Sequence, residues 1–262
     1  TALMDITRIK AQITSKTKYI IPVHIFGTPC DMNEISEISQ RFDLTVIEDA
    51  AQAHGSLIGE RKAGSFGAFS CFSFYPTKNL GGYGDGGMVL TNSRKNFDKL
   101  NLLRNYGKKG NDPFTSYEPG INSRLDEIQA AVLRVKLRYL EEMNQERAVR
   151  VKLYREGLKD QPLIFLKEPD GTKSNCHILT MLCPEHRDGL RRYLEQRKIQ
   201  TNIYYPEPLN RMPAYAPFIK TGQKFPVSEK LAGEVIAIPL YPELPLETVE
   251  HVIDTIKAFF AG

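Results

Sequence analysis

The side chains best suited to chemistry lie in one stretch of the sequence, between residues 46 and 92. A short apolar run, Val46-Ile47, ends in the carboxylates Glu48 and Asp49, and an aromatic run, GAFSCFSFY, ends just ahead of Lys78. An acid at the carboxyl end of a strand buried on both faces points into the crevice where open α/β sheets bind ligands. An apolar environment would depress the pKa of Lys78 and make its amine a nucleophile. A lysine that forms a Schiff base, with an acid facing a pyridinium nitrogen, is the pairing that pyridoxal phosphate chemistry requires.

Each of these residues also has a plainer interpretation. Taken singly, a surface lysine and a helix-capping aspartate would be the more common explanation, because single residues carry little information. Five glycines follow Lys78 between residues 81 and 87. They would let the backbone approach a ligand closely, or simply form a tight turn.

The elements that must position these side chains follow from the apolar spacing around them. Residues 19–26 (YIIPVHIF) are predicted to form a strand, although Pro22 argues against the middle of a hydrogen-bonded ladder. Asp31 is predicted to cap the next helix, with Glu34 completing a capping box. The buried face of that helix would consist of Ile35, Ile38 and Phe42. With the strand at residue 46, this order predicts a right-handed βαβ unit in a mostly parallel α/β sheet.

The remainder of the chain predicts a connector and a second α/β domain. After residue 92, a helix is expected to bury Phe97, Leu100 and Leu103. A capping box of Ser123 and Asp126 would open a helix that runs to about Leu158 and connects two domains. The last helix is amphipathic, with an apolar side formed by Val249, Val252, Ile253 and Ile256. The predicted division is 1–122 as part of a large cofactor-binding domain, 123–159 as the connecting helix and 160–262 as a small C-terminal α/β domain.

Composition excludes several classes of protein. The chain has 262 residues, a net charge of +4 and no dense Lys/Arg run, so no nucleic-acid partner is predicted. Its four cysteines form no CxxC pair or zinc-site spacing, which favours a reduced, cytoplasmic compartment. No signal peptide is predicted at the start, and no apolar run is long enough for a membrane span. His24, His54 and His177 match no metal motif, so no metal site is predicted.

Longer motifs in this sequence point to a family. They are EDAAQAHG at 48–55, SFGAFSCFSFYPTKNLGGYGDGG at 65–87, YIIPVHIFGTPCDM at 19–32, LLRNYGKKG at 102–110, GINSRLDEIQAAVLRVKL at 120–137 and IPLYPEL at 238–244. From about residue 6 onward, the chain resembles the DegT/DnrJ/EryC1/StrS family of pyridoxal phosphate-dependent nucleotide-sugar aminotransferases. The resemblance implies the aspartate aminotransferase-like (type I) fold, with a mostly parallel large-domain sheet and a small C-terminal α/β domain. Family members have further residues ahead of this point, so it also implies that the N-terminal part of the large domain is missing.

The resemblance also implies roles for individual residues. Lys78 would bind pyridoxal 5'-phosphate covalently and move a proton between substrate and cofactor. Asp49 would pair with the ring nitrogen, and Ser73 would bind the phosphate. Gln52 would contact the phenolic oxygen, or serve as a turn residue. Asn122 would reach the phosphate in the neighbouring subunit of a homodimer with shared active sites, or be only a polar residue flanking a helix.

Substrate contacts are less strongly indicated. Tyr83, among the glycines, and His177, where the family has a histidine near substrate, are weaker candidates. Asn210 stands where relatives commonly have histidine, which puts contacts from that loop in doubt.

The implied reaction is transamination of a nucleotide-linked keto sugar, with L-glutamate as donor and 2-oxoglutarate as product. The sugar is expected to be a dTDP-linked 3-keto- or 4-keto-6-deoxyhexose, aminated for a surface polysaccharide or a glycosylated metabolite. Two alternatives stay open. Related sugar dehydratases have histidine in place of the lysine, so Lys78 favours transamination. The second alternative is a non-catalytic regulatory relative of the same fold. The intact set of Asp49, Gln52, Ser73 and Lys78 argues against it.

Overall fold

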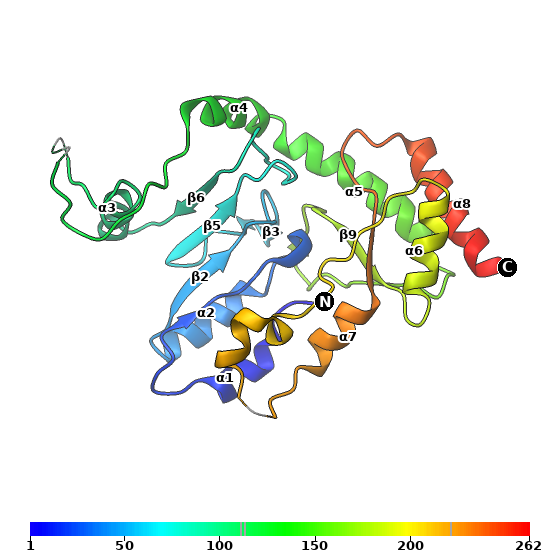
Figure 1. The fold of residues 1–262 in the computed structure, drawn as a ribbon, viewed down its shortest axis with the longest axis horizontal. Helices are drawn as coiled ribbons and strands as arrows, with labels where there is room; N and C mark the ends of the chain where they lie inside the picture. The colour runs from blue at the N-terminus through cyan, green and yellow to red at the C-terminus, as the bar shows by residue number, and fades with distance from the viewer. Residues whose placement is uncertain (111, 113, 221) are drawn as a thin grey trace. The chain divides into compact units, whose positions relative to one another are not determined.

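The chain folds into two compact units, each with its own apolar core (Figure 1). The computed structural model describes residues 1–110, 112, 114–220 and 222–262. The N-terminal unit comprises Leu3–Glu142 and Pro169–Asn175. The C-terminal unit comprises Thr1–Ala2, Met143–Glu168 and Cys176–Gly262.

The main sheet of the N-terminal unit has the strand order β1-β2-β5-β6. Its strands are β1 (Tyr19–Ile20), β2 (Thr45–Asp49), β5 (Phe69–Ser73) and β6 (Gly87–Leu90). The first three are parallel, and β6 runs antiparallel to β5. Strand β1 ends before Pro22, which has no N–H for a ladder, and one parallel bridge from Val23 to Asp49 extends the pairing. This is the predicted α/β arrangement, with the carboxyl ends of β2 and β5 side by side.

Helix α2 (Met32–Arg41) lies between β1 and β2 in the chain and forms as predicted. The Asp31 carboxylate accepts hydrogen bonds from two backbone N–H groups of the first turn, both at 3.1 Å. Ile35 and Ile38 are buried, as expected. The prediction was wrong for Phe42, which is exposed, because the helix ends one residue earlier and Phe42 is its C-cap.

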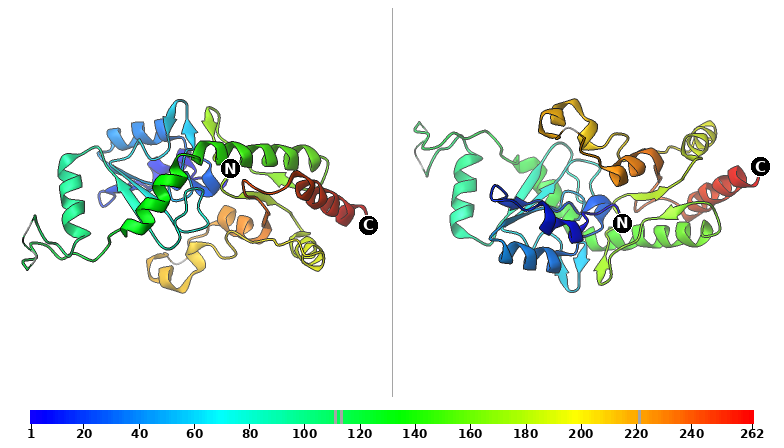
Figure 2. Two further views of the ribbon diagram at one scale, coloured as in Figure 1. Left: turned by 90° about the horizontal axis from the view of Figure 1, so that it is seen from above. Right: turned by 90° about the horizontal axis from the view of Figure 1, so that it is seen from below.

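Helix α3 (Arg94–Leu103) forms where predicted, but its apolar side is not buried. No side chain of this helix is buried, and Phe97 is 50% exposed. Figure 2 shows α3 at one end of the N-terminal unit. Leu100 and Leu103 are only half-buried, so the prediction of a buried side is wrong.

The long connecting helix of the prediction is two helices, α4 (Glu127–Leu137) and α5 (Leu140–Gly157). The N–H groups of Arg138 and Tyr139 bond carbonyls three residues back, the tight geometry typical of a helix end. The break occurs between Leu133 and Leu140, which are buried in one cluster with Phe74 and Leu80. The predicted capping box is also wrong, since the N-cap Asp126 makes no side-chain cap and the helix starts after it.

A second sheet of the N-terminal unit joins segments far apart in sequence. Its antiparallel strands, in the order β4-β3-β8, are β4 (Arg61–Lys62), β3 (Leu57–Ile58) and β8 (Thr172–Lys173). Strand β8 belongs to residues 169–175, which follow α5 and return to this unit.

The C-terminal unit is built on an antiparallel sheet with the order β10-β9-β7. Its strands are β7 (Ile164–Phe165), β9 (Leu179–Leu182) and β10 (Val235–Ile238). Helices α6 (Arg187–Gln196) and α8 (Leu246–Ala261) pack against each other (Figure 1). The predicted apolar side of α8 is confirmed, because its members are all buried in the core of this unit: Val249, Val252, Ile253 and Ile256.

Shorter elements complete the two units. They are η1 (Ile6–Arg8), α1 (Ile9–Gln12), η2 (Ile25–Gly27), η3 (Leu209–Arg211), η4 (Pro213–Phe218) and α7 (Pro226–Glu234). Among the described residues, no helix combines the length and apolar character needed to cross a bilayer.

Candidate active site

Strand β2 presents its two terminal carboxylates to opposite faces of the sheet, because successive side chains of a strand alternate. Asp49 is half-buried, and its Oδ1 accepts a hydrogen bond from the Ala51 N–H at 3.1 Å. Glu48 is fully buried. The two neighbouring acids therefore lie in different environments, and only Asp49 retains access to a ligand.

The Glu48 carboxylate accepts hydrogen bonds from five donors. These are the N–H groups of Gly64 (2.7 Å), Phe66 (2.7 Å) and Gly67 (2.6 Å), the Ser70 hydroxyl (3.1 Å) and His24 Nε2 (3.0 Å). Burial alone would raise the pKa of Glu48, but the hydrogen bonds outweigh burial and hold its pKa below the ordinary value. The carboxylate thus ties the loop that precedes β5 to the end of β2.

His24 joins this network as a neutral donor. Its Nδ1 accepts a hydrogen bond from the Cys30 N–H at 3.1 Å, so the ring proton is on Nε2, which donates to Glu48. Glu48 is therefore a buried anion that hydrogen bonds stabilise, without a positive charge on His24.

Lys78 follows β5 in a turn closed by its own N–H, which donates to the Tyr75 carbonyl at 2.9 Å. The side chain is half-buried. Burial lowers the pKa of Lys78 below its ordinary value, and the negative charge of Asp49 partly opposes that shift. The structure therefore brings together the two residues that the sequence singles out for chemistry, and a larger share of the lysine is neutral and nucleophilic.

His54 is part of this site, although its sequence context suggests only a partly buried histidine. Its ring is 4% exposed and lies near the rings of Phe72 and Phe74, with centroid distances of 5.2 and 6.0 Å. Burial, the largest cause, and the charge of Lys78 together lower the pKa of His54 to about 4, while a hydrogen bond with the Ser73 backbone opposes the shift. His54 is thus a neutral, aromatic neighbour of the lysine.

The buried state of His54 predicts a loss of stability in acid. An unfolded histidine has a pKa of about 6.5, so the unfolded chain takes up a proton first as the pH falls. The contribution of neutral, buried His54 to the free energy of unfolding is therefore complete above about pH 6.5 and is lost as the pH falls toward 4. We expect this group to lower the free energy of unfolding by about 2 kcal/mol between about pH 7 and pH 5. Urea unfolding of wild type and His54→Gln at both pH values measures it, and an equal acid loss in the variant would contradict it.

Gln52 and Ser73 both lie between Asp49 and Lys78 in the chain. Gln52 Oε1 accepts a hydrogen bond from the Phe26 N–H, which fixes the direction of the amide. Ser73 Oγ accepts from the Tyr75 N–H at 3.3 Å, and its hydroxyl proton can be donated to an anion. Both side chains are half-buried, so they remain accessible to a ligand.

Helix α4 holds the glycine-rich loop that follows Lys78. Gln129 Oε1 accepts from the Tyr83 N–H at 2.7 Å, and Lys136 Nζ donates to the Gly81 carbonyl at 2.6 Å. A Cβ on Gly81 would lie 2.3 Å from the Pro76 carbonyl oxygen, so only glycine fits there. The Tyr83 side chain is 78% exposed, and Lys136 Nζ lies 5.8 Å from the centroid of its ring.

The two remaining candidates occupy different places. Asn122 is exposed in the N-terminal unit, where its Oδ1 accepts from Arg124 Nε at 3.0 Å. His177 is buried in the C-terminal unit. Asn122 thus belongs to the same unit as Lys78, and His177 belongs to the other.

The residues around Lys78 fit pyridoxal phosphate. The lysine amine has a lowered pKa, the Asp49 carboxylate lies within electrostatic reach of it, and Ser73 provides a hydroxyl donor. The amine suits the carbonyl of the cofactor, the carboxylate suits its pyridinium nitrogen, and the hydroxyl suits its phosphate.

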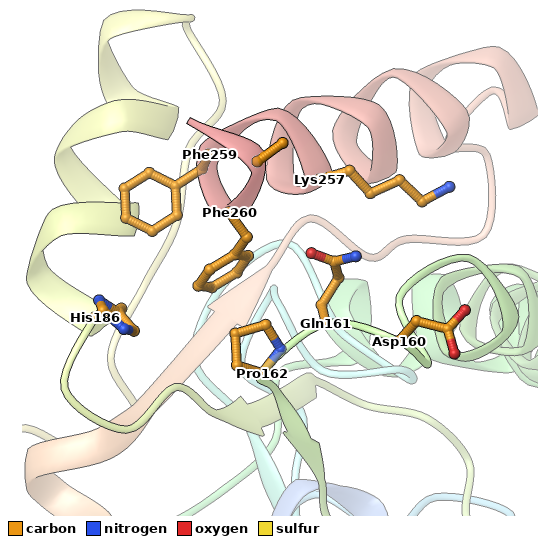
Figure 3. Close-up of a pocket in the computed structure, with 8 residues that line it drawn as sticks. Asp160, Gln161, Pro162, His186, Lys257, Phe259 and Phe260 are labelled. Carbon is orange, nitrogen blue, oxygen red and sulfur yellow. The ribbon is translucent and has the colours of Figure 1, made fainter.

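A pocket of about 610 Å³ lies elsewhere, in the C-terminal unit, near the end of α8 (Figure 3). Its lining residues are Asp160, Gln161, Pro162, His186, Lys257, Phe259, Phe260 and Ala261. None of the candidate residues lines this pocket, so it is separate from the chemistry described above. Among the described residues, no three His, Cys, Asp or Glu side chains are grouped as a metal site.

The fold and the lysine–carboxylate pair define an aspartate aminotransferase-like enzyme that depends on pyridoxal phosphate. The chain belongs to the DegT/DnrJ/EryC1/StrS aminotransferase family, which matches residues 1–257. This confirms the class of protein, the fold and the cofactor that the motifs predicted.

Individual relatives support this assignment. The chain is 42% identical over 256 residues to the erythromycin biosynthesis sensory transduction protein EryC1 of Saccharopolyspora erythraea, covering 97% of this chain and 69% of the relative. It is 39% identical to dTDP-3-amino-3,4,6-trideoxy-alpha-D-glucose transaminase of Streptomyces venezuelae, covering 97% of this chain and 66% of the relative. The crystal structure of S. venezuelae DesV, in complex with a reaction intermediate, superposes with a TM-score of 0.94 at 37% identity, covering 99% of this chain and 70% of DesV.

Proposed function

We propose that the protein transfers an amino group to a nucleotide-linked keto sugar, using L-glutamate as the donor. The observation that carries the proposal is the half-buried Lys78, with a lowered pKa beside Asp49. The dTDP-3-amino sugar named for the Streptomyces venezuelae transaminase supports a dTDP-linked 3-keto-6-deoxyhexose as acceptor, ahead of a 4-keto sugar. The product would be an amino sugar for a surface polysaccharide or a glycosylated metabolite.

Lys78 would perform two tasks in this reaction. Its amine would hold the cofactor, and the same nitrogen would move a proton from the substrate carbon. Burial favours both tasks, because a neutral amine is the form that attacks a carbonyl and accepts a proton. Bound pyridoxal phosphate supplies an electron sink for the negative charge that develops at that carbon.

The other candidates would hold the cofactor in place. Asp49 keeps the ring nitrogen protonated, and Ser73 donates to the phosphate. The Gln52 amide, whose direction is set by its bond to Phe26, would contact the ring oxygen. Asn122, exposed in this structure, would donate to the phosphate in a partner subunit of a homodimer. Tyr83 and His177 would contact the sugar substrate.

Two other functions compete with this one. Sugar dehydration uses the same cofactor, but Lys78 stands where related dehydratases have histidine. A regulatory role is suggested by the name of the EryC1 relative, a sensory transduction protein. The lowered pKa of Lys78 favours chemistry over a binding role, since a binding scaffold has no need of a nucleophilic amine.

An absorption spectrum of the purified protein with pyridoxal phosphate tests the proposal. We expect a visible band from cofactor bound to Lys78, and L-glutamate should replace it with the shorter-wavelength band of pyridoxamine phosphate. L-alanine at the same concentration is the matched control for the donor. A band that glutamate leaves unchanged would reject glutamate and favour dehydration, and no band would favour the regulatory role.

A further inference from the structure

Asn175 joins the surroundings of Lys78 from a distant part of the sequence. It ends the segment 169–175, in which β8 pairs with β3 and so returns to the N-terminal unit. The residue is 2% exposed. A polar side chain buried to this degree requires hydrogen-bond partners, and these identify what it holds.

The first set of partners lies in the turn that contains Gln52 and His54. Asn175 Nδ2 donates to the Gln52 carbonyl at 2.9 Å and to the His54 carbonyl at 3.1 Å. The Asn175 N–H donates to Ser56 Oγ at 3.1 Å, and that hydroxyl donates to the Gly27 carbonyl at 2.7 Å. One asparagine thus fixes the turn at both of its ends.

A second contact leads to the lysine. Asn79, which directly follows Lys78, is 5% exposed, and its Nδ2 donates to the Asn175 carbonyl at 3.0 Å. Gly27, with a φ of 89°, leaves room for this arrangement, since a Cβ there would lie 1.8 Å from Asn175 Oδ1. A side chain at position 27 would therefore clash with Asn175.

We propose that Asn175 is a positioning residue of the active site, which fixes the turn of Gln52 and His54 relative to Asn79 and hence to Lys78. The inference deepens the proposed function, since it rests on Lys78 and Gln52 as cofactor ligands. The lysine and the amide come from separate loops, and Asn175 is hydrogen-bonded to both loops at once. Buried networks of this kind restrict a site to one arrangement only while every member is paired.

Asn175→Ala tests the proposal in two measurements. In the cofactor-free protein, we expect hydrogen exchange of backbone amides in the peptide covering 50–57 to rise about tenfold, because the Gln52 and His54 carbonyls lose their donor. With cofactor, we expect the dissociation constant of pyridoxal phosphate to rise about tenfold. We also expect borohydride to attach a smaller fraction of the bound cofactor to Lys78.

Lys173→Ala is the matched control, since it lies in the same segment but its side chain is exposed and forms an ion pair with Glu141, at 3.6 Å, away from both loops. It should leave all three readouts at wild-type values. If Asn175→Ala fails to fold, Asn79→Ala removes the hydrogen bond from the Lys78 loop to the Asn175 backbone carbonyl and should raise exchange at 76–82. Unchanged exchange and unchanged borohydride attachment in a folded variant would overturn the proposal. A wild-type protein that takes up no pyridoxal phosphate would count against the proposed function instead, and the exchange measurement would still test the link between the loops.

Discussion

Replacing Lys78 with alanine should lower kcat for amino transfer by a factor on the order of 10⁴ or more, because the variant loses both the nucleophile and the base. The visible absorption band of bound pyridoxal phosphate should disappear, while the free energy of unfolding changes little at a half-buried site. Release of 2-oxoglutarate from L-glutamate, measured with a keto sugar acceptor, gives the rate.

Two further variants separate chemistry from charge. Lys78→Arg keeps a positive charge near Asp49, but its guanidinium stays protonated and should be as inactive as alanine. Lys95→Ala, at an exposed position of α3, should behave as wild type. A Lys78→Ala protein that retains a tenth of the wild-type rate would show that another group takes the proton.

Replacing Glu48 with glutamine should lower the free energy of unfolding by about 3–5 kcal/mol. Five donors converge on this carboxylate, so the new NH₂ group must face an N–H or O–H that donates toward it. Urea denaturation of the cofactor-free protein measures the loss.

The pH dependence of the same variant checks the cause. The pKa of Glu48 is lowered in the folded state, so its stabilisation is present above the pKa of an unfolded glutamate and is lost in acid. Glu48→Gln should therefore lose less stability than wild type as the pH falls below about 4. Glu37→Gln, at an exposed position of α2, is the control and should match wild type. A Glu48→Gln protein as stable as wild type would mean that the five hydrogen bonds contribute nothing net.

The elements with local signals were the ones that sequence could predict. Helix α2 follows from a capping aspartate and its apolar spacing, and both are properties of about ten neighbouring residues. The proximity of Asp49 and Lys78 could be predicted from the sequence, because the carboxyl ends of parallel strands meet at one edge of a sheet. The prediction needed only the order of strands, and their register places Asp49 opposite Cys71 in the strand that leads to Lys78.

The remaining features depend on contacts that no local pattern records. Asn175 lies 123 residues from Gln52 in the chain, and nothing in its neighbourhood distinguishes it from a loop asparagine. The place of His54 in the site depends on tertiary contacts with Phe72 and Phe74, which bury it beside Lys78. The break between α4 and α5 could not be read from helical periodicity, because it depends on how Leu133 and Leu140 share one cluster.

The return of residues 169–175 to the N-terminal unit has a consequence for the order of folding. A ribosome makes β3 more than a hundred residues before β8, its antiparallel neighbour. During synthesis, strand β3 and the turn of Gln52 and His54 must wait for Asn175, and by then α5 and β7 of the other unit have also been made. Domains commonly fold one after another from the N-terminus as the chain emerges. Here the N-terminal unit cannot be completed before α5 and β7 have been made, so the surroundings of Lys78 become complete only after part of the C-terminal unit exists.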